Sequence, residues 1–591
     1  MSKKALCLLI LALGSTVLFA QNNNSISLPF WDDFSTSQDM PDPNMWETGA
    51  DIYINNTLPI NAPSINVATF DGANALGAPH NTTPESQGAA DSLISRPINL
   101  AAVSNRSSVF LTFYWQVKGN GEIPESLDSM RLQFFDRDSV WQTVWSITGG
   151  PEQVSDEFTF ESIQITDARY FHNGFQMKFQ SFSSLSGIFD TWHIDYVYLN
   201  ENRMLINGTL TPRTLDRTIS TGPGPLFGDY YQIPSTDTTI TFSSSQVTTL
   251  NNLDNTVHPV DYQHTITNLA RNEVIESRQF ISTILRPNET RSVSGINSIS
   301  LPEIQEGDSL VLQSEFFYKT GDRNLFEEIG TNGDTLFLDI DLTVNDTIRT
   351  NYLIHNKYAY DDGSAEFAAG INLDQGLIAV QFVSNARDTL SHIEVHFPAF
   401  PENEGLPLDL VVWRDLEEDG EITRQSYTIT APIGRNAFEE VPLFPPVIVE
   451  DTFYIGYQQF TDQYIGLGLD RSNDVGDKIF FNTDRTWQQN QLLEGALMIR
   501  PVFREVDAIV LSTKKPFEVT KVYPNPTSGI IHIEGAYQAL SVSDLSGKVV
   551  AVFNQRNDID LSHLKDGIYL LRIRQKDTIL TRKLILQRNG Y

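Results

Sequence analysis

Residues 190–197 read DTWHIDYV, and Tyr198 continues the same alternation. Successive side chains of an extended strand point to opposite faces. One face would therefore carry four large residues, Trp192, Ile194, Tyr196 and Tyr198. The other face would carry His193, Asp195 and Val197. This segment predicts a β-sandwich strand whose core face is mainly aromatic.

The same period-two pattern recurs along most of the chain, in short runs rich in Phe, Tyr, Val, Ile and Thr. The clearest runs are residues 109–117, 130–135, 175–182, 377–383, 392–397 and 453–457. Residues 269–285 would also suit a helix, but Phe280, Ile281 and Ile284 fit a strand equally well, and we expect a strand. We predict an all-β protein of consecutive β-sandwich or jelly-roll domains that ends in a small immunoglobulin-like sandwich.

The length of 591 residues corresponds to about four domains. Hydrophobic residues make up 40% and charged residues 19% of the chain, so we expect packed cores and no extensive disorder. The formal net charge of −33 would repel nucleic-acid phosphates, which argues against nucleic-acid binding. No later run of eighteen apolar residues occurs, so we expect no transmembrane segment.

Residues 1–20 have the pattern of a secretory signal peptide. Two lysines precede a short apolar run, and Ala20 is the small residue before the predicted cleavage at Gln21. Cys7, the single cysteine of the chain, lies inside this segment. The exported protein would therefore contain neither a disulfide nor a thiol nucleophile.

The region over residues 26–202 begins with LPFWDDF at 28–34, contains WQTVW at 141–145 and closes with WHID at 192–195. On these segments it resembles the MAM-type, concanavalin-like jelly rolls of bacterial surface proteins. The resemblance implies a two-sheet sandwich built around a large aromatic core.

Two further β-rich regions follow. Residues 211–350 alternate strand runs with turn segments such as RPNET, which favours an immunoglobulin-like spacer sandwich. Residues 358–503 open with YDDGSAE at 360–366 and contain long alternating strands, which favours a second jelly roll.

The residues from 514 onward differ sharply in charge from those before them. They include 12 basic and 7 acidic residues, a net charge of +5, whereas residues 21–513 carry 27 basic and 67 acidic residues, a net charge of −40. Such an abrupt change of sign marks a module boundary. About seven short runs, interrupted by the prolines of YPNP at 523–526, predict a small sandwich over residues 514–591.

This terminal region resembles the type A C-terminal sorting domain of the type IX secretion system of Bacteroidetes-type bacteria. The matching positions are Tyr523, Pro524, Asn525, Pro526, Gly529, Asp544, Gly547, Lys548, Gly567, Tyr569 and Lys583. The resemblance implies export to the periplasm, recognition by the outer-membrane translocon and removal of the domain by a sortase-like peptidase. The rest of the chain would then be released or joined to surface lipopolysaccharide, so we expect a secreted or outer-surface protein.

The body of the chain lacks the usual catalytic motifs. Nucleophile elbows, metalloprotease helices, Walker sequences and phosphate-binding glycine loops do not occur in a plausible context. Acidic pairs are too numerous for a glycosidase pair to be assigned or excluded. We therefore expect a non-catalytic, adhesive role with a glycan or matrix ligand. A secreted hydrolase with a divergent active site and a structural surface component are the alternatives.

Calcium is the one cofactor that the sequence suggests. Lectin-like jelly rolls often tie their terminal strands together through such an ion, and the resemblance makes Asp33, Asp71 and Asp195 candidate ligands. Residues 392–396, HIEVH, place two imidazoles and a carboxylate on one face of a strand. Neighbours on that face lie about 7 Å apart, so a solvated strand face is the simpler interpretation.

Asp415, Glu417 and Asp419 form a second candidate calcium site, because they resemble the first half of an EF-hand loop. Position twelve of that loop would be Ser426 instead of the usual Glu. A strand-turn-strand with Asp-Gly at the bend explains the same residues.

Sugars stack on flat aromatic rings, and four tryptophans could form such a platform: Trp31, Trp46, Trp141 and Trp487. In a sandwich, however, tryptophan more often belongs to the core. Sequence alone leaves both assignments open.

Overall fold

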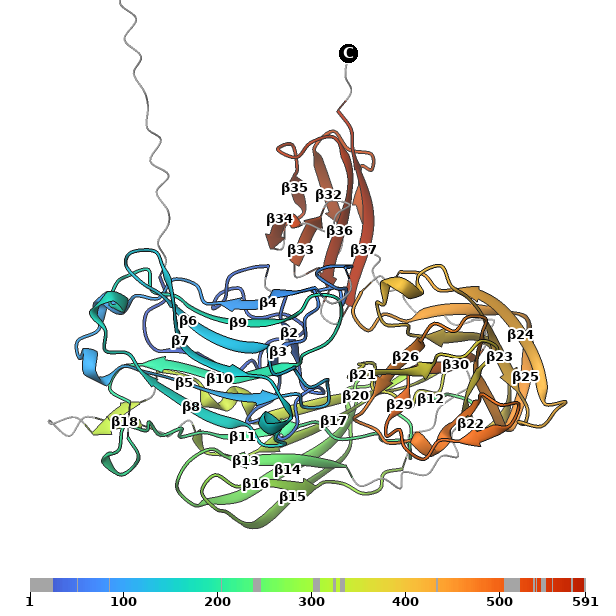
Figure 1. The fold of residues 1–591 in the computed structure, drawn as a ribbon, viewed down its shortest axis with the longest axis horizontal. Helices are drawn as coiled ribbons and strands as arrows, with labels where there is room; N and C mark the ends of the chain where they lie inside the picture. Colours follow the sequence, from blue (N-terminus) through green and yellow to red (C-terminus); the bar gives the residue numbers. More distant parts are fainter. Residues whose placement is uncertain are drawn as a thin grey trace, which may run out of the picture. The chain divides into compact units, whose positions relative to one another are not determined.

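The computed structural model shows an all-β chain (Figure 1). It describes residues 25–49, 51–83, 86–203, 205–237, 246–300, 309–322, 326–329, 335–337, 339–431, 434–503, 521–534, 537, 539–543, 549–554, 556–575 and 578–588. The chain divides into two compact units, Met1–Val506 and Asp507–Tyr591. Within the described ranges, no helix is both long enough and apolar enough to cross a membrane. The predicted signal peptide and its cleavage site at Ala20 and Gln21 lie outside the described residues.

The first sandwich consists of two antiparallel sheets. One sheet has the order β2-β3-β10-β5-β8, with β1 also paired to β10. Its strands are β1 Phe30–Asp32, β2 Tyr53–Asn55, β3 Val67–Phe70, β5 Phe110–Val117, β8 Thr159–Gln164 and β10 Trp192–Asn200. The other sheet has the order β4-β9-β6-β7. Its strands are β4 Gln87–Ile94, β6 Ser129–Phe135, β7 Trp141–Thr148 and β9 Met177–Ser184.

Strand β10 departs from the alternation predicted for it. Trp192 and Ile194 belong to the core between the two sheets, as predicted, but Val197 and Leu199 join them. The register with β5 shifts between Asp195 and Tyr198, and Tyr196 has a φ of 53°. This bulge reverses the alternation, because an inserted residue moves the following side chains to the opposite faces. The prediction that Tyr196 and Tyr198 share the core face of Trp192 is therefore wrong.

The second sandwich combines a sheet of order β11-β13-β16 with one of order β12-β20-β17-β14-β15. Their strands are β11 Arg217–Thr221, β12 Gln232–Pro234, β13 Val247–Asn252, β14 His258–Asn268, β15 Glu273–Leu285, β16 Thr290–Ser294, β17 Leu310–Tyr318 and β20 Thr347–His355. A separate hairpin joins β18 Phe326–Ile329 to β19 Thr335–Phe337. The strand expected over residues 269–285 is confirmed as β15.

The third sandwich contains the longest strands of the chain, β22 Leu377–Val395 and β25 Glu439–Gln459, which pair antiparallel. The runs predicted at 377–383 and 392–397 are thus mostly parts of one strand. Its other strands are β21 Phe367–Ile371, β23 Pro407–Trp413, β24 Glu421–Thr428, β26 Ile465–Asp470, β27 Ile479–Asn482, β28 Trp487–Gln489, β29 Ala496–Leu497 and β30 Ile499–Phe503. One buried cluster connects this sandwich with the second, for example through Tyr352, Tyr358 and Phe382.

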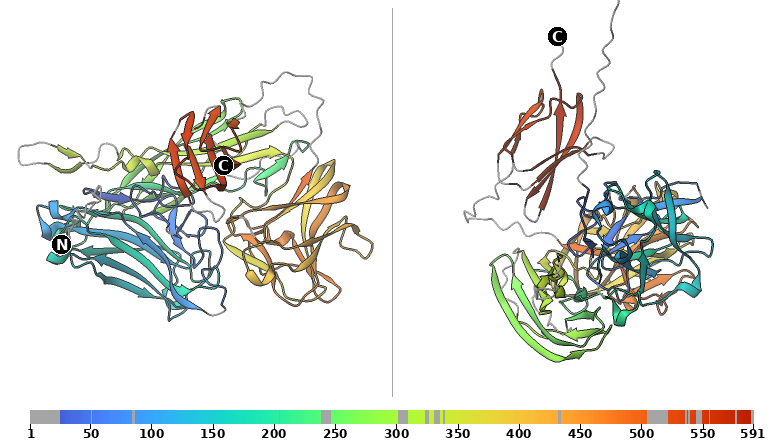
Figure 2. Two further views of the ribbon diagram at one scale, coloured as in Figure 1. Left: turned by 90° about the horizontal axis from the view of Figure 1, so that it is seen from above. Right: turned by 90° about the vertical axis from the view of Figure 1, so that its left-hand side faces the viewer.

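The terminal unit is a small sandwich, red in Figure 2. Its described strands are β31 Lys521–Tyr523, β32 Ile530–Glu534, β33 Ala539–Ser543, β34 Val549–Asn554, β35 Asp558–Asp560, β36 Gly567–Gln575 and β37 Thr578–Leu586. They form sheets of order β31-β32-β35 and β34-β33-β36-β37 around a core that includes Ile531, Leu540 and Leu571. The expected small sandwich is therefore present.

Several residues of the predicted sorting motif hold this unit together. The Asn525 side chain donates to the Lys583 carbonyl at 2.7 Å and accepts from the Ile585 amide at 2.9 Å, so the segment between the two prolines is tied to β37. Gly529 has a φ of 149°, and a Cβ there would lie 3.1 Å from the Ser562 Cβ. The Tyr569 hydroxyl donates to the Lys565 carbonyl. Asp544, Gly547 and Lys548 lie outside the described residues.

Candidate functional site

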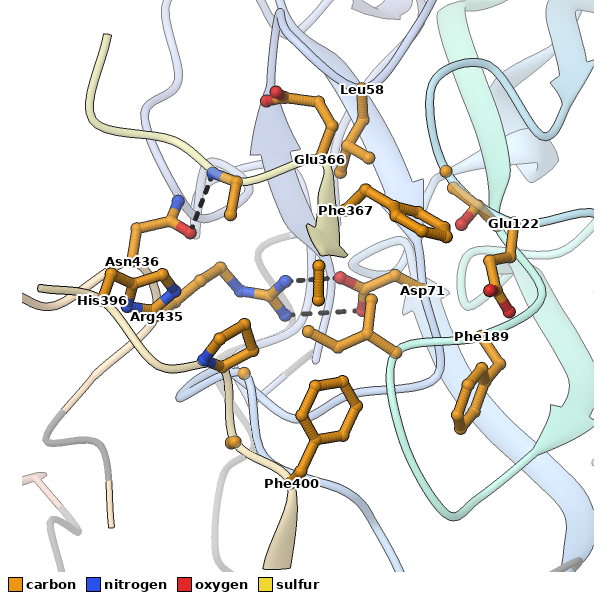
Figure 3. A pocket seen from close by; sticks show the side chains of 18 of the residues that line it. Leu58, Asp71, Glu122, Phe189, Glu366, Phe367, His396, Phe400, Arg435 and Asn436 are labelled. Atoms are coloured by element: carbon orange, nitrogen blue, oxygen red, sulfur yellow. Dashed lines mark hydrogen bonds and ion pairs between the residues drawn. The ribbon is translucent and has the colours of Figure 1, made fainter. Parts of the chain in front are cut away.

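A cavity of about 350 Å³ lies between the first and third sandwiches of the larger unit (Figure 3). We call it the central cavity. The first sandwich contributes loop residues around Asp71 and residues 121–122 and 186–191. The third contributes residues 365–368, 396–402, 434–436 and Tyr464. Because its walls come from two sandwiches, the cavity depends on how these two bodies pack together.

Four aromatic rings line the central cavity: Phe189, Phe367, Phe400 and Tyr464. Phe367 begins β21 and is 37% exposed, while Tyr464 precedes β26 and is 42% exposed. The Tyr464 hydroxyl donates to the Ala368 carbonyl at 2.9 Å, and its ring lies edge-on to Phe400 at 6.4 Å. These contacts fix the orientation of the Tyr464 ring while part of its surface stays accessible.

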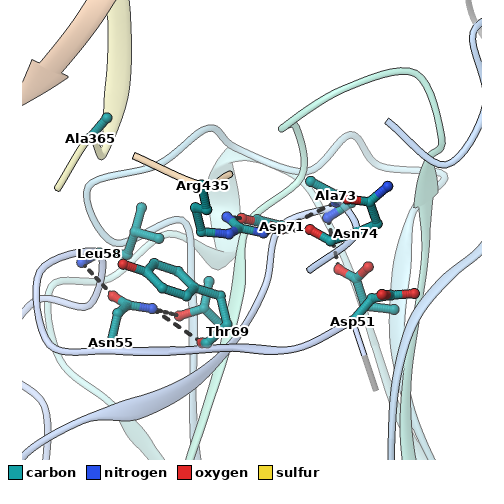
Figure 4. A network of polar contacts seen from close by, with 12 residues as sticks. Asp51, Asn55, Leu58, Thr69, Asp71, Ala73, Asn74, Ala365 and Arg435 are labelled. Carbon is teal, nitrogen blue, oxygen red and sulfur yellow. Dashed lines mark hydrogen bonds and ion pairs between the residues drawn. The ribbon is translucent and has the colours of Figure 1, made fainter. Parts of the chain in front are cut away.

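Arg435 of the third sandwich pairs with Asp71 of the first at one wall of the cavity (Figure 4). Asp71 is fully buried, and Arg435 also donates to the Asn74 carbonyl at 3.1 Å. The guanidinium carbon lies 4.5 Å from the centre of the Tyr53 ring. Asp71 therefore has a guanidinium as its counter-ion, and its role as the calcium ligand that the sequence suggested stays a prediction.

Three carboxyl groups also line the cavity: Glu122, Glu366 and Glu402. Burial, followed by the charge of Glu125, raises the pKa of Glu122 above its ordinary value. Burial and then the charge of Asp362 raise the pKa of Glu366 to about 7. Removal of water disfavours the charged form of both groups.

The structure brings together two of the three residues of the predicted first-sandwich calcium site. Ser64 donates to Asp195 from its amide at 3.0 Å, and its hydroxyl donates to the Asp33 carbonyl. The side chain of Asp33 accepts instead from Asn345 at 2.7 Å. Asp33 and Asp195 are thus neighbours, but Asp71 lies apart in its ion pair with Arg435.

Residues 392–396 do not bring three potential ligand atoms within 4.8 Å of one another. His392 contacts Ser391 and Glu440, whereas Glu394 pairs with Lys357. Strand β22 ends at Val395, and the buried His396 donates through Nδ1 to the Ala437 carbonyl at 2.8 Å. Each member therefore has its own partner, but the expected solvated strand face is not observed, because His396 is buried and His392 and Glu394 are only partly exposed.

The loop containing Asp415, Glu417 and Asp419 is the turn of the hairpin formed by β23 and β24. The Arg414 amide donates to the Gly420 carbonyl at 2.8 Å, and Asp415 accepts from the Glu417 amide at 3.1 Å. The strand-turn-strand interpretation is confirmed.

None of the four tryptophans considered for a glycan platform lines the central cavity. Trp46 is fully buried and donates from its indole to Asp32 at 2.6 Å, so it belongs to the core. Trp31 packs on Tyr196, Trp141 on Phe135 and Trp487 on Trp413. The accessible rings at the cavity are Phe and Tyr, and sequence spacing gave no signal for them.

Sequence reasoning also missed a group of three carboxylates, Glu125, Asp128 and Asp190. Their oxygens lie within 4.8 Å of one another, and this is the one group of three or more potential metal ligands within the described ranges. Asp128 accepts from the Glu125 amide at 2.7 Å, and Asp190 accepts from the Ser184 amide at 2.7 Å. Burial, followed by the adjacent carboxylates, raises the pKa of Asp190 to about 8. Asp190 lies at least 62 positions from the other two carboxylates, so the group could not be recognised from sequence.

We expect Asp190→Asn to make unit Met1–Val506 more stable at pH 9. Because the pKa of Asp190 is raised in the folded chain, the contribution of this group to the free energy of unfolding is fully present below pH 4. It is lost as the pH rises through about 8. Asparagine keeps the acceptor for the Ser184 amide and tolerates the φ of 63° at this position. Thermal unfolding from pH 5 to 9 should show a flatter profile and a gain of about 1 kcal/mol at pH 9. The exposed Asp138→Asn serves as the control, and an unchanged profile for Asp190→Asn would contradict the prediction.

Comparisons with known proteins identify the end of the chain. Residues 521–587 match the family described as the secretion system C-terminal sorting domain. The sorting domain predicted from the terminal motifs is thus confirmed, and it indicates export to the cell surface or secretion. It also implies interaction with the secretion system. A search of curated proteins returns no match.

Similar solved structures include a β-glucuronidase of Bacteroides uniformis, at 11% identity and a TM-score of 0.21 over 50% of this chain and 30% of that one. A putative β-galactosidase of Bacteroides fragilis has 11% identity and a TM-score of 0.19 over 51% of this chain and 36% of that one. The Endo-D glycoside hydrolase domain of Streptococcus pneumoniae has 10% identity and a TM-score of 0.19 over 56% and 44%. The chain thus covers less than half of each of these structures. The MAM-type resemblance of residues 26–202 stays a prediction. The comparisons show a family for one part of the chain: residues 521–587 belong to the secretion system C-terminal sorting domain.

Proposed function

We propose that the exported body binds a glycan in the central cavity and performs no covalent chemistry on it. The observation that carries this proposal is a cavity of about 350 Å³ with aromatic rings on its walls, two of them more than one-third exposed. Ligand sites typically combine such apolar walls with a few polar groups that fix orientation. Sugar rings present C–H faces that pack on aromatic rings, and hydroxyls that bond carboxylates. The sorting domain supports the proposal, since it delivers the body to where extracellular glycans occur.

Replacing Tyr464 with alanine tests the proposal directly. Truncation removes an accessible ring, and we expect glycan affinity to fall about tenfold, equivalent to roughly 1.4 kcal/mol. The control is Tyr464→Phe, which keeps the ring and loses only the bond to the Ala368 carbonyl. Glycan-array screening of residues 21–513, followed by calorimetry on the best ligand, provides the measurement. Absence of any glycan ligand, or hydrolysis of the bound oligosaccharide, would overturn the proposal.

Deleting the sorting domain tests the export route. A chain that ends at Thr513 should accumulate in the periplasm, because it lacks the domain that the translocon recognises. Cell fractionation and surface immunolabelling of the full and shortened chains measure this. Normal surface levels of the shortened chain would show that the terminal unit is dispensable for export.

A further inference from the structure

The titratable groups of the central cavity are mainly acidic. Glu122, Glu366 and Glu402 line it, and the basic side chains among its lining residues are Arg435 and His396. Arg435 is already paired with Asp71. His396 is buried, burial lowers its pKa, and its Nδ1 donates to a backbone carbonyl, so it is neutral at pH 7. An anionic ligand would therefore find no free positive charge among these residues.

Carboxylates and aromatic faces favour the opposite kind of ligand. An ammonium group gains Coulomb energy beside a carboxylate that has lost part of its water. It is also attracted to the negative face of an aromatic ring within about 6 Å of the ring centre. Phe367 and Tyr464 supply accessible rings, and Glu122 supplies a half-buried carboxyl in the same cavity.

We infer that the central cavity selects glycans that carry free amino groups over neutral glycans and rejects acidic ones. This inference rests on the proposed glycan-binding function and adds the charge class of the ligand. Repulsion between the carboxylates of Glu122 and Glu402 and an acidic sugar adds to the selectivity that comes from attraction for an amine.

The test uses the exported protein and three oligosaccharides of equal length: a glucosamine tetramer, its fully N-acetylated form and a galacturonic acid tetramer. The first two share one backbone and differ in the charged amine. Calorimetry at pH 6.5 should give an affinity at least tenfold higher for the amine form than for the acetylated form, with no detectable binding of the acid. Raising the salt concentration should reduce the preference, since it rests on charge.

Two variants test which carboxylate causes the preference for the amine form over the acetylated form. Glu122→Gln should lower the ratio of the amine-form affinity to the acetylated-form affinity about tenfold, because it removes a charge that attracts only the amine. Glu152→Gln replaces an exposed glutamate of the same sandwich that does not line the cavity, and it should change neither.

The outcomes separate this inference from the proposed function. Equal binding of the amine and acetylated tetramers, or tighter binding of the acid, overturns the inference and leaves glycan binding intact. A lysine-rich peptide that binds as tightly as the amine tetramer shows that the cavity recognises amines without recognising sugars, which also overturns it. Failure of all three tetramers and of the glycan array overturns both.

Discussion

Arg435→Met should lower the free energy of unfolding of unit Met1–Val506 by about 3–5 kcal/mol, because it leaves the Asp71 carboxylate buried without a counter-ion. The pair joins positions 364 residues apart, one in each sandwich, so its loss should also remove glycan binding in the central cavity. Denaturant unfolding and ligand titration measure the two effects.

The double variant Asp71→Asn, Arg435→Met should recover part of the lost stability, because it removes the unpaired charge. Arg414→Met is a matched control, since Arg414 and its partner Asp415 have side chains that are 68% and 44% exposed. Arg414→Met should lower the free energy of unfolding by less than about 1 kcal/mol. A cost this small for Arg435→Met would show that the ion pair does not hold the two sandwiches together.

Trp46→Ala should destabilise the same unit by about 3–5 kcal/mol, the cost of removing a large aromatic side chain from a core. Trp46 is fully buried between Phe30 and Phe34, at ring distances of 5.2 and 6.0 Å. Its indole also donates to the buried Asp32 at 2.6 Å, so truncation leaves a cavity and a carboxyl without that donor.

Trp487→Ala is the comparison, because Trp487 is only partly buried on a three-residue edge strand. It should cost less than half as much as Trp46→Ala in thermal or denaturant unfolding. If Trp46→Ala unfolds like the unchanged chain but loses glycan binding, Trp46 acts in a binding platform and its assignment to the core is wrong.

The strands were predictable because side-chain alternation is a local property. Strands β5, β6 and β9 lie within two residues of the runs expected at 109–117, 130–135 and 175–182. The prediction for β10 failed at Tyr196, where a bulge reverses the faces after Asp195. A bulge depends on the pairing with β5, and alternation within one strand carries no information about its partner's register.

The terminal unit was the best predicted part of the chain. Its turn residues, such as Asn525 and Gly529, occur in a recognisable motif, although their contacts in the folded unit are to residues distant in the sequence, such as Lys583 and Ser562. The metal predictions fared differently, because ligand residues act through distances that only the folded chain sets. Asp33 and Asp195 did come close together, whereas Asp71 pairs with a residue of another sandwich.

Sequence by itself determined that this chain is built of β-sandwiches, that it ends in a sorting domain and that it is exported. The strands follow from alternation and turn chemistry, and the module boundary from the change in charge at residue 514, whereas the sorting domain and the export follow from the resemblance of the terminal motifs to a known family. Only the tertiary structure decided where a ligand could bind, because Phe189, Phe400 and Tyr464 meet in one cavity although they are far apart in the sequence. Alternation tells which side of a strand a residue occupies, but packing between sandwiches decides which residues become neighbours.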